Sequence, residues 1–297
     1  MKENLISVIV NCYNGEKYLL KTLQSIKKQR YKKFEVIFFD NCSTDDSAKI
    51  FKNINDKRFK YFKTKKKVKL YKARNLALNK CRGDFITFLD TDDWWDKNFL
   101  SSRKSFFTSV KDYGFSYSNC FHHYENTNKT KIFSKKKFLS GFVTKNLLND
   151  YIVKMGTIII KKKIAKLYKF NENFNIIGDY DYILRVSEKF KAKAFNDCLV
   201  TIRVHQNNFS HNNRKEFYNE FKRWIKSKNF NKINYKENKD KLFSKLEYLR
   251  LIYLLLENKT LGLIVDIIRY PSLLFKLKLL LIYFTPLHVI KLKNKYF

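Results

Sequence analysis

Four short apolar runs alternate with helix-like segments over the first 100 residues, and this alternation restricts the possible folds. The runs are rich in β-branched and aromatic residues: LISVIVN (5–11), FEVIFFD (34–40), RFKYFK (58–63) and DFITFLD (84–90). Apolar residues recur with helical spacing over 16–29 and 71–80, and Ser43 or Thr44 is placed to cap a further helix. Strands that alternate with helices in units of this length are typical of a parallel sheet covered on both faces. The sequence therefore predicts an α/β fold with a mostly parallel central sheet flanked by helices.

Three clusters of polar residues follow these strands: NCYN (11–14), DNCSTD (40–45) and DTDD (90–93). In parallel sheets ligands bind beyond the carboxyl ends of the strands, so we expect the clusters to share one cleft. The acid in the third cluster is conspicuous because the 297-residue chain carries 62 Lys and Arg against 27 Asp and Glu, a formal net charge of +35. Carboxylates this close together would strongly repel an anionic ligand.

A divalent cation resolves this conflict. Mg²⁺ and Mn²⁺ take one or two carboxylates together with phosphate oxygens, and such a metal neutralises a diphosphate leaving group. The glycine-rich phosphate loops G-x-x-x-x-G-K-[ST] and G-x-G-x-x-G are absent from the sequence. We therefore expect a metal and basic side chains, and not a glycine cradle, to hold the phosphates.

Four motifs occur in order over the first 100 residues: SVIVNCYNGEKYL, FFDNCSTDDS, KARNLAL and GDFITFLDTDDW. In these residues the chain closely resembles the family 2 inverting glycosyltransferases, which have the Rossmann-like GT-A fold. The resemblance implies a nucleotide-diphospho-sugar donor, most often UDP-linked, and a divalent metal, Mg²⁺ or Mn²⁺, held by the DTD motif. It also implies a hexosyltransferase that joins the sugar to a hydroxyl of a glycan or lipid-linked acceptor in the biosynthesis of surface polysaccharides or glycoconjugates.

The resemblance assigns donor-binding roles residue by residue. Tyr13 matches the aromatic residue that stacks on the nucleobase, which suits its flat π-face; its alternative role is a core tyrosine at a sheet end. Asp40 and Asn41 match the family's paired acids, the second of which usually accepts the uracil N3 proton. Asn41 departs from that acid, although an amide oxygen also accepts this bond. Arg74 matches a basic residue that faces the nucleotide, and its alternative is an arginine on a helix surface.

The metal motif is assigned in the same way. Asp90 and Asp92 match its two ends, with Asp92 as the more direct ligand and Asp90 nearer the ribose. Asp93 either supports the metal ligands or caps a helix over 94–100.

A closing motif follows much later in the chain. IRVHQNNFS (202–210) resembles the family's Arg-x-His…Ser segment, by which His205 would approach the diphosphate or the metal. Without the resemblance, His205 would be taken for a surface histidine. The pair His122 and His123 has no such support and is expected to be a strand or loop feature.

The catalytic base is expected in NIIGDYDYILRV, which resembles the family's acidic motif at a helix start. Asp179 takes the position of the base there. An inverting transfer needs a carboxylate that removes the proton from the acceptor hydroxyl while that oxygen attacks the anomeric carbon. The alternative role of Asp179 is a plain helix N-cap. Asp181 ranks below Asp179 because, two residues further along a helix, it points elsewhere.

The composition changes after about residue 211. Residues 211–297 hold 19 Lys and Arg against 7 Asp and Glu, and their aliphatic runs are interrupted by residues such as Asp266 and Lys276. No uncharged stretch of about 18 residues is present to span a bilayer. We expect a basic helical extension that lies amphipathically on an anionic membrane surface; the alternative is an appendage that packs on the catalytic domain or on a dimer partner. The expected divisions are 1–100 for the nucleotide-sugar half, 101–210 for the acceptor half, with strands at 115–119 and 154–162, and 211–297 for the extension.

The predicted location follows from the cysteines and the N-terminus. Five widely spaced cysteines without a C-x-x-C pair indicate a reducing compartment. The apolar run at the N-terminus spans only about six residues, shorter than a signal-peptide core. We expect a cytoplasmic protein that is peripheral at the inner face of the cell membrane.

A second class of function competes with the enzyme: a basic protein that binds nucleic acid or another polyanion without catalysis. Clustered Lys and Arg alone would suffice for that role. It leaves the aspartates after the fourth strand and the second acidic motif unexplained. We therefore favour the transferase and expect no nucleic-acid partner.

Overall fold

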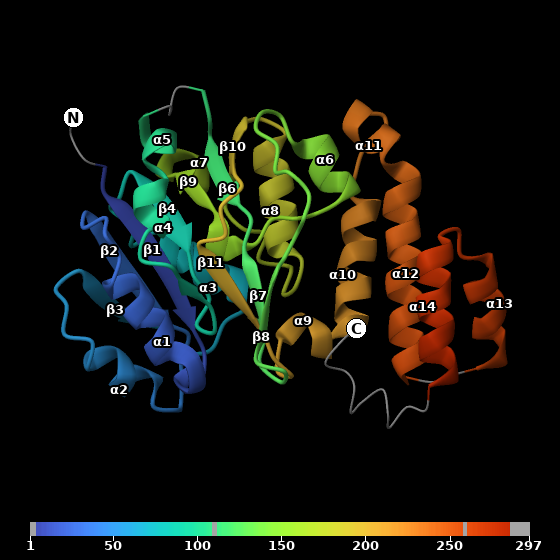
Figure 1. Ribbon diagram of the computed structural model, residues 1–297, viewed down its shortest axis with the longest axis horizontal. Coiled ribbons are helices and arrows are strands. Elements are labelled where there is room, and N and C mark those ends of the chain that lie inside the picture. The colour runs from blue at the N-terminus through green and yellow to red at the C-terminus, as the bar shows by residue number, and fades with distance from the viewer. Residues whose placement is uncertain (1–3, 109–111, 258–259, 286–297) are drawn as a thin grey trace. The chain divides into compact units, whose positions relative to one another are not determined.

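The computed structural model describes residues 4–108, 112–257 and 260–285 (Figure 1). The chain divides into two compact units between Val204 and His205. The first unit is α/β and the second is helical. The expected division near residue 100 falls inside the first unit, so the two halves of that unit stay a prediction.

Within the described residues, the first unit contains a seven-stranded sheet in the order β10-β6-β9-β4-β1-β2-β3. Its strands are β1 (Ile6–Cys12), β2 (Phe34–Asp40), β3 (Phe59–Lys63), β4 (Phe85–Phe88), β6 (Phe115–Ser118), β9 (Ile159–Lys161) and β10 (Ala192–Phe195). β1 lies parallel to both β2 and β4, β2 lies parallel to β3, and β6 lies parallel to β10. β9 runs antiparallel to its neighbours β4 and β6. The predicted mostly parallel sheet is confirmed.

Both faces of the central strands are buried, which is why their apolar runs lack a polar alternation. Val8 and Val10 of β1 join one buried cluster with Leu19 and Leu23 of α1 (Glu16–Lys27). Ile9, between the two valines, is also buried, and α3 (Leu70–Leu78) packs near β1 and β2. Helices therefore cover both faces (Figure 1). Further helices of this unit are α2 (Ser47–Lys52), α4 (Phe99–Ser102), α5 (Lys104–Thr108), α6 (Thr144–Asn149), α7 (Lys162–Tyr168) and α8 (Gly178–Ser187).

Two local predictions were wrong. α2 begins at Ser47 without a side-chain cap, and Ser43 Oγ instead accepts a hydrogen bond from the backbone of Asn14 at 3.1 Å. The segment 154–162 is not one strand, because the backbone first turns through a short 3₁₀ helix, η1 (Met155–Thr157), before β9.

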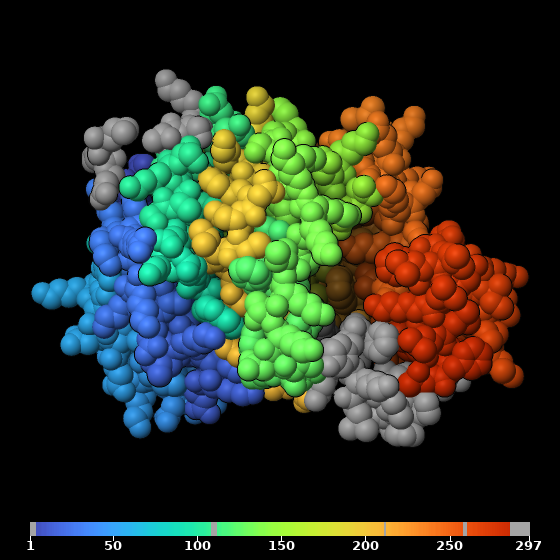
Figure 2. All heavy atoms as spheres, in the orientation of Figure 1, coloured from blue at the N-terminus to red at the C-terminus, as the bar shows by residue number. Residues whose placement is uncertain are grey.

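A second, four-stranded sheet has the order β5-β11-β7-β8. Its strands are β5 (Trp94–Trp95), β11 (Val200–Val204), β7 (Phe121–Tyr124) and β8 (Lys129–Ile132). The structure excludes the alternative of a helix over 94–100, because Trp94 and Trp95 pair with β11 and the next helix starts at Phe99. All residues of β8 are exposed, and the β7–β8 hairpin lies on the surface in Figure 2.

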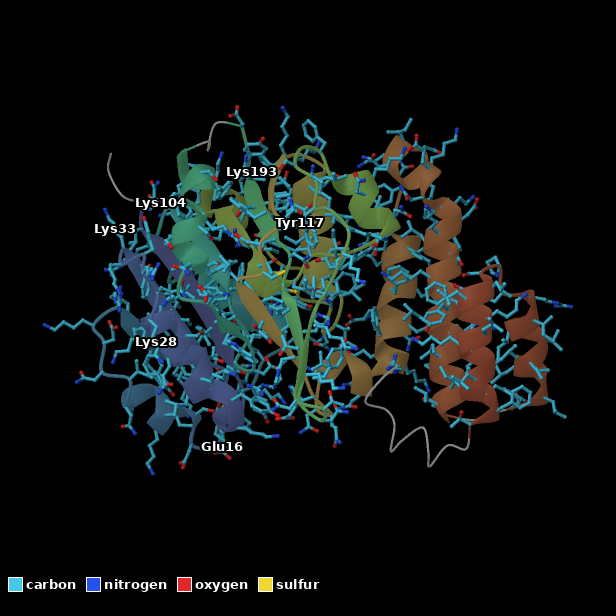
Figure 3. The ribbon with its side chains drawn as sticks, in the orientation of Figure 1. Glu16, Lys28, Lys33, Lys104, Tyr117 and Lys193 are labelled. Carbon is cyan, nitrogen blue, oxygen red and sulfur yellow. The ribbon has the colours of Figure 1, made fainter. Side chains whose placement is uncertain are left out.

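The first unit has lysines on its surface, whereas several other charged side chains, Arg74, Asp93 and Arg103 among them, are buried. Lys28 and Lys104 are exposed and lie at its periphery, whereas Tyr117 is buried in its interior (Figure 3).

The second unit is helical, as predicted for the C-terminal extension. Its helices are α9 (Phe209–Asn212), α10 (Arg214–Lys226), α11 (Ile233–Glu237), α12 (Lys239–Glu257), α13 (Leu261–Arg269) and α14 (Leu273–Phe284). α12, α13 and α14 share a core that includes Leu255, Ile267 and Leu279. In the parts of the chain that the structure describes, we find no helix with the length and apolar character needed to cross a bilayer.

Candidate active site

The strand register brings the carboxyl ends of β1, β2 and β4 to one edge of the sheet. Cys12 at the end of β1 pairs with Asp40 at the end of β2, and the Asn41 backbone donates to the Cys12 carbonyl at 2.7 Å. Leu89, just after β4, donates to the Ile9 carbonyl at 3.0 Å. The three polar clusters that the sequence singled out therefore start from neighbouring positions.

Tyr13 follows β1 with an exposed ring. Its side chain is 44% exposed, so it is not a core tyrosine. Lys67 Nζ lies 3.7 Å from the ring centroid, a cation–π distance. A flat ring at this edge of the sheet fits the predicted stacking on a nucleobase.

Asp40 is fully buried and shapes the loop after β2. One carboxylate oxygen accepts a hydrogen bond from the Ser43 backbone at 2.7 Å, and the other accepts one from the Tyr61 hydroxyl. Burial, and then this bond to Asp40, raise the pKa of Tyr61. Direct contact between Asp40 and a nucleotide would require the carboxylate to leave these partners, so its donor-binding role stays a prediction.

Asn41 pairs its amide with the backbone of Val68. Nδ2 donates to the Val68 carbonyl at 2.7 Å, and Oδ1 accepts from the Val68 N–H at 2.9 Å. This pairing needs a donor and an acceptor on the same side chain, and a carboxylate has only acceptors. The departure from the family's second acid therefore has a structural reason in this chain.

Arg74 is buried and joins α3 to the end of β4. Its Nη2 donates to Asp90 Oδ1 at 2.8 Å, and its guanidinium carbon lies 5.5 Å from the ring centroid of Tyr71, 5.7 Å from that of Phe170 and 5.9 Å from that of Phe88. Burial alone would lower the pKa of Arg74, but the negative charge of Asp90, together with Tyr71 and other neighbours, raises it. Arg74 is therefore not a helix-surface arginine.

Asp93 anchors the metal motif to β11. Its Oδ1 accepts a hydrogen bond from the Arg203 backbone at 2.9 Å, and Arg203 Nε donates to the Asp92 carbonyl at 3.1 Å. Burial, followed by the charges of Asp92 and Asp90, raises the pKa of Asp93 well above its usual range. Asp93 is not a helix cap; it ties this segment to β11, and its support of metal ligands at Asp90 and Asp92 stays a prediction.

Asp179 lies in the first turn of α8 and is partly buried. Its Oδ1 accepts from the Tyr180 backbone at 2.7 Å, and the Tyr71 hydroxyl lies 3.4 Å from the same oxygen. Burial raises the pKa of Asp179, while the charges of Arg74 and Lys154 oppose that rise. A partly buried carboxylate with a raised pKa is suited to exchange protons.

Asp181 has a different environment, although it lies only two residues further along α8. It is buried and forms an ion pair with Arg185 Nε at 2.8 Å. The same guanidinium donates to the carbonyls of Tyr168 and Lys169. Asp181 therefore holds α8 to the end of α7.

His205 is the first residue of the helical unit. Its Nδ1 accepts a hydrogen bond from the Asn207 backbone at 3.2 Å. In the neutral ring this bond leaves the proton on Nε2, and the approach of His205 to the diphosphate stays a prediction. Metal ligation by His205 stays a prediction.

The comparison with known families shows to which family the chain belongs. The family described as Glycosyl transferase family 2 matches residues 7–167, more than half of the chain. The chain belongs to glycosyltransferase family 2. It is 31% identical over 215 residues to the UDP-Glc:alpha-D-GlcNAc-diphosphoundecaprenol beta-1,3-glucosyltransferase WfaP of Escherichia coli, covering 71% of this chain and 82% of that protein.

Solved structures agree with this family 2 assignment. TarS of S. aureus in complex with UDP-GlcNAc has a TM-score of 0.67 at 18% identity, over 90% of this chain and 81% of that one. The mannosyltransferase PcManGT from Pyrobaculum calidifontis, in complex with GDP-Man and Mn²⁺, has a TM-score of 0.64 at 15% identity, over 99% and 85%. At these identities the likeness shows the fold, which is GT-A. As a family 2 glycosyltransferase the chain is an enzyme, and the alternative of a polyanion-binding protein without catalysis no longer holds.

Arg203 and Lys154 of this family 2 enzyme were not singled out from the sequence. Arg203 lies in the closing Arg-x-His motif, so a signal was present, but only the fold reveals its bonds to Asp92 and Asp93. The positive charge of Lys154 lowers the pKa of both Asp93 and Asp179. No motif distinguishes Lys154 from the other basic residues in a sequence with 62 Lys and Arg.

The carboxylates of Asp90 and Asp92 are suited to a divalent cation that also binds substrate phosphates. Asp90 and Asp92 concentrate enough negative charge to contribute to the raised pKa of Asp93. Within the described ranges, no three His, Cys, Asp or Glu side chains gather into a complete metal site. Mg²⁺ is commonly held by one or two carboxylates, with phosphate oxygens and water as its other ligands.

Proposed function

We propose that this enzyme transfers a sugar from a UDP-sugar to a hydroxyl of a glycan or lipid-linked acceptor in surface polysaccharide biosynthesis, with inversion at the anomeric carbon. The observation that carries the proposal is the position of Arg74. It bonds to Asp90 of the donor motif, and its charge also acts on Asp179. The buried guanidinium therefore bonds to the carboxylate of the donor motif, and its charge lowers the pKa of the candidate base.

On the donor side, the exposed Tyr13 ring would stack on the nucleobase and Asp90 would face the ribose. A uridine nucleotide is supported by WfaP, whose name specifies UDP-Glc, and by the TarS complex with UDP-GlcNAc. PcManGT was solved with GDP-Man, so the test includes both nucleotides.

Asp92 and Asp90 would hold Mg²⁺ or Mn²⁺. When bound, the metal supplies Lewis-acid neutralisation of the diphosphate leaving group. Arg74 fixes the orientation of the Asp90 carboxylate, and Arg203 fixes the backbone at Asp92. Both ligand positions are thereby held before the donor binds, which reduces the cost of ordering them.

On the acceptor side, Asp179 would remove the proton from the attacking hydroxyl. The oxygen then forms a bond to the anomeric carbon on the face opposite the departing diphosphate, and the configuration inverts. Lys154, near Asp179, helps to keep the carboxylate in its charged form. Because Asp181 is committed to Arg185, we assign the base to Asp179 alone.

We also propose that the helical unit attaches the enzyme to the inner, anionic face of the cell membrane. Large apolar side chains remain exposed on α13 and α14: Leu261 83%, Leu273 69%, Leu274 75%, Leu281 61% and Phe284 70%. On α14 the exposed Leu273, Leu277, Leu281 and Phe284 recur at intervals of three and four residues and so form one apolar stripe, and such a stripe marks an interaction surface. Basic residues of the helical unit, such as Lys276 on α14, add attraction to anionic lipid.

Donor hydrolysis tests the proposed function directly. Purified enzyme with Mn²⁺ is incubated with a panel of UDP- and GDP-sugars, and the released nucleotide is followed by mass spectrometry. We expect release from a UDP-sugar, and its loss in Asp92→Asn. No turnover of any nucleotide sugar in the presence of Mn²⁺ or Mg²⁺ would contradict the proposal.

A further inference from the structure

Gly178 lies where the Tyr71 ring meets the start of α8. A Cβ atom added at Gly178 would lie 2.4 Å from Cδ2 and from Cε2 of Tyr71. Real Cβ atoms do not come this close to an aromatic carbon, and Tyr71 is only 2% exposed, so the ring has little room to withdraw. The Tyr71 ring therefore occupies the space that any side chain at position 178 would need.

The Tyr71 hydroxyl lies against the same turn. It donates to the Ile176 carbonyl at 2.8 Å and lies 3.4 Å from Asp179 Oδ1. Its ring stacks on Phe170 with centroids 5.6 Å apart and planes inclined by 20°. Tyr71 thus holds the backbone at Ile176, before Gly178, and lies beside the carboxylate of Asp179, after it.

α3 supplies this side chain and the buried arginine from one face. Tyr71 and Arg74 are three residues apart, so they are neighbours on the helix surface. Arg74 binds Asp90, and Tyr71 borders Asp179. α3 therefore contacts both carboxylates, one through Arg74 and the other through Tyr71.

We propose that Tyr71, accommodated by Gly178, is a positioning residue that holds Asp179 in the orientation needed to remove the acceptor proton. The inference rests on the proposed role of Asp179 as the base. Rates depend steeply on the placement of a catalytic group, since a displacement of about 1 Å costs about 10²-fold. Tyr71 itself transfers no proton in this scheme.

Tyr71→Phe keeps the ring and removes only the hydroxyl. We expect kcat for transfer to fall about 10-fold, with KM for the donor little changed, because the loss is confined to orientation. Gly178→Ala displaces the ring and should lower kcat about 10²-fold. Tyr182→Phe is the control: its buried hydroxyl, also on α8, has no hydrogen-bond partner among the described residues, and its kcat should equal that of the wild type.

The double variant Tyr71→Phe/Asp179→Asn separates positioning from a general effect on the fold. If Tyr71 acts through Asp179, it should be no slower than Asp179→Asn alone, whereas a structural defect would add to the loss. Thermal unfolding of Tyr71→Phe serves as a check on folding, in case Gly178→Ala does not fold.

The possible failures are distinguishable. Wild-type kcat in Tyr71→Phe, together with a large loss in Asp179→Asn, would overturn the positioning role and leave the base in place. Wild-type kcat in Asp179→Asn would overturn both proposals. A further loss in the double variant would show that Tyr71 acts through the fold and not through Asp179.

Discussion

Asn41 and Val68 exchange two hydrogen bonds of opposite direction, at 2.7 and 2.9 Å, and so tie the loop after β3 to the end of β2. The loop carries Lys67, whose Nζ lies 3.7 Å from the centroid of the exposed Tyr13 ring. One wall of the proposed nucleobase site is therefore held by an amide pair that the usual acid of the family would not form.

We expect Asn41→Asp to weaken donor binding. A carboxylate oxygen would face the Val68 carbonyl in place of a donor, and the lost bond and the repulsion should cost about 1–3 kcal/mol. The KM for the donor should rise about 10-fold or more, measured by steady-state kinetics. Asn55→Asp, at an exposed position, is the matched control for the change in charge and should leave KM unaltered. An improved KM in Asn41→Asp would instead indicate that an acid at this position reads the base.

Removal of the metal should abolish transfer. We expect excess EDTA to stop turnover and added Mn²⁺ or Mg²⁺ to restore it, because the diphosphate leaves with uncompensated charge otherwise. Asp92→Asn should be inactive at the same metal concentrations without a change in thermal midpoint, since the two side chains are nearly equal in volume. Undiminished activity in EDTA would rule out the metal mechanism.

Replacement of the base should act on catalysis and not on binding. Asp179→Asn should lower kcat by about 10²- to 10⁴-fold, the usual loss when a general base is removed, with little change in the affinity for the donor. Asp181→Asn breaks the bond to Arg185 and should chiefly reduce stability. A larger loss of kcat in Asp181→Asn than in Asp179→Asn would reverse the assignment.

The pH dependence of kcat should report the Asp179 carboxylate. The active form is deprotonated, and because burial raises the pKa of Asp179, activity should be lost on acidification at a pH above the ordinary aspartate value of about 3.9. Arg74 and Lys154 lower this pKa and Asp90 raises it. Lys154→Met should therefore move the acidic limb to higher pH.

The exposed Lys104 provides the control for this shift, since Lys104→Met removes the same charge at the periphery of the unit (Figure 3). Its acidic limb should coincide with that of the wild type. An unmoved limb in Lys154→Met would mean that another group governs the profile.

Membrane attachment should depend on the apolar surface of α14. The full-length protein should sediment with anionic vesicles and be only partly released by high salt, because salt screens the lysines but not the apolar contacts. The variant Leu274→Glu/Leu281→Glu should remain in the supernatant and still hydrolyse the donor. Leu167→Glu, at a 73% exposed position on α7, controls for an added acid. If the full-length protein does not sediment with vesicles, the result would favour the alternative that the helical unit packs on the catalytic domain or on a dimer partner.

The parts of the fold that follow from local pattern were predictable. The buried runs of β1, β2 and β4 and the helical spacing of α1 are properties of neighbouring residues, and they placed the polar clusters at one edge of the sheet. The pairing of Trp94 with Thr201 and the antiparallel course of β9 depend on distant segments, so no local pattern revealed them.

The candidate site divides along the same line. Asp90, Asp92 and Asp179 were predicted because they stand in motifs, but their hydrogen-bond partners were not predicted. Arg74 was expected to face the nucleotide, and only the packing of α3 shows that it bonds to Asp90. Tyr71 was not predicted, because its role depends on the contact of its ring with Gly178, a residue more than 100 positions away.

The bond between Asp93 and Arg203 spans 110 residues of chain, and this sets an order of events during synthesis. A nascent chain that ends near residue 100 already contains every aspartate of the metal motif, but not the backbone N–H that Asp93 needs. Only when β11 has left the ribosome does that N–H become available. Contacts between such distant segments form late in folding. The hydrogen bond of Asp93 can therefore form only after β11 has been made, and a chain that terminates before Arg203 lacks it.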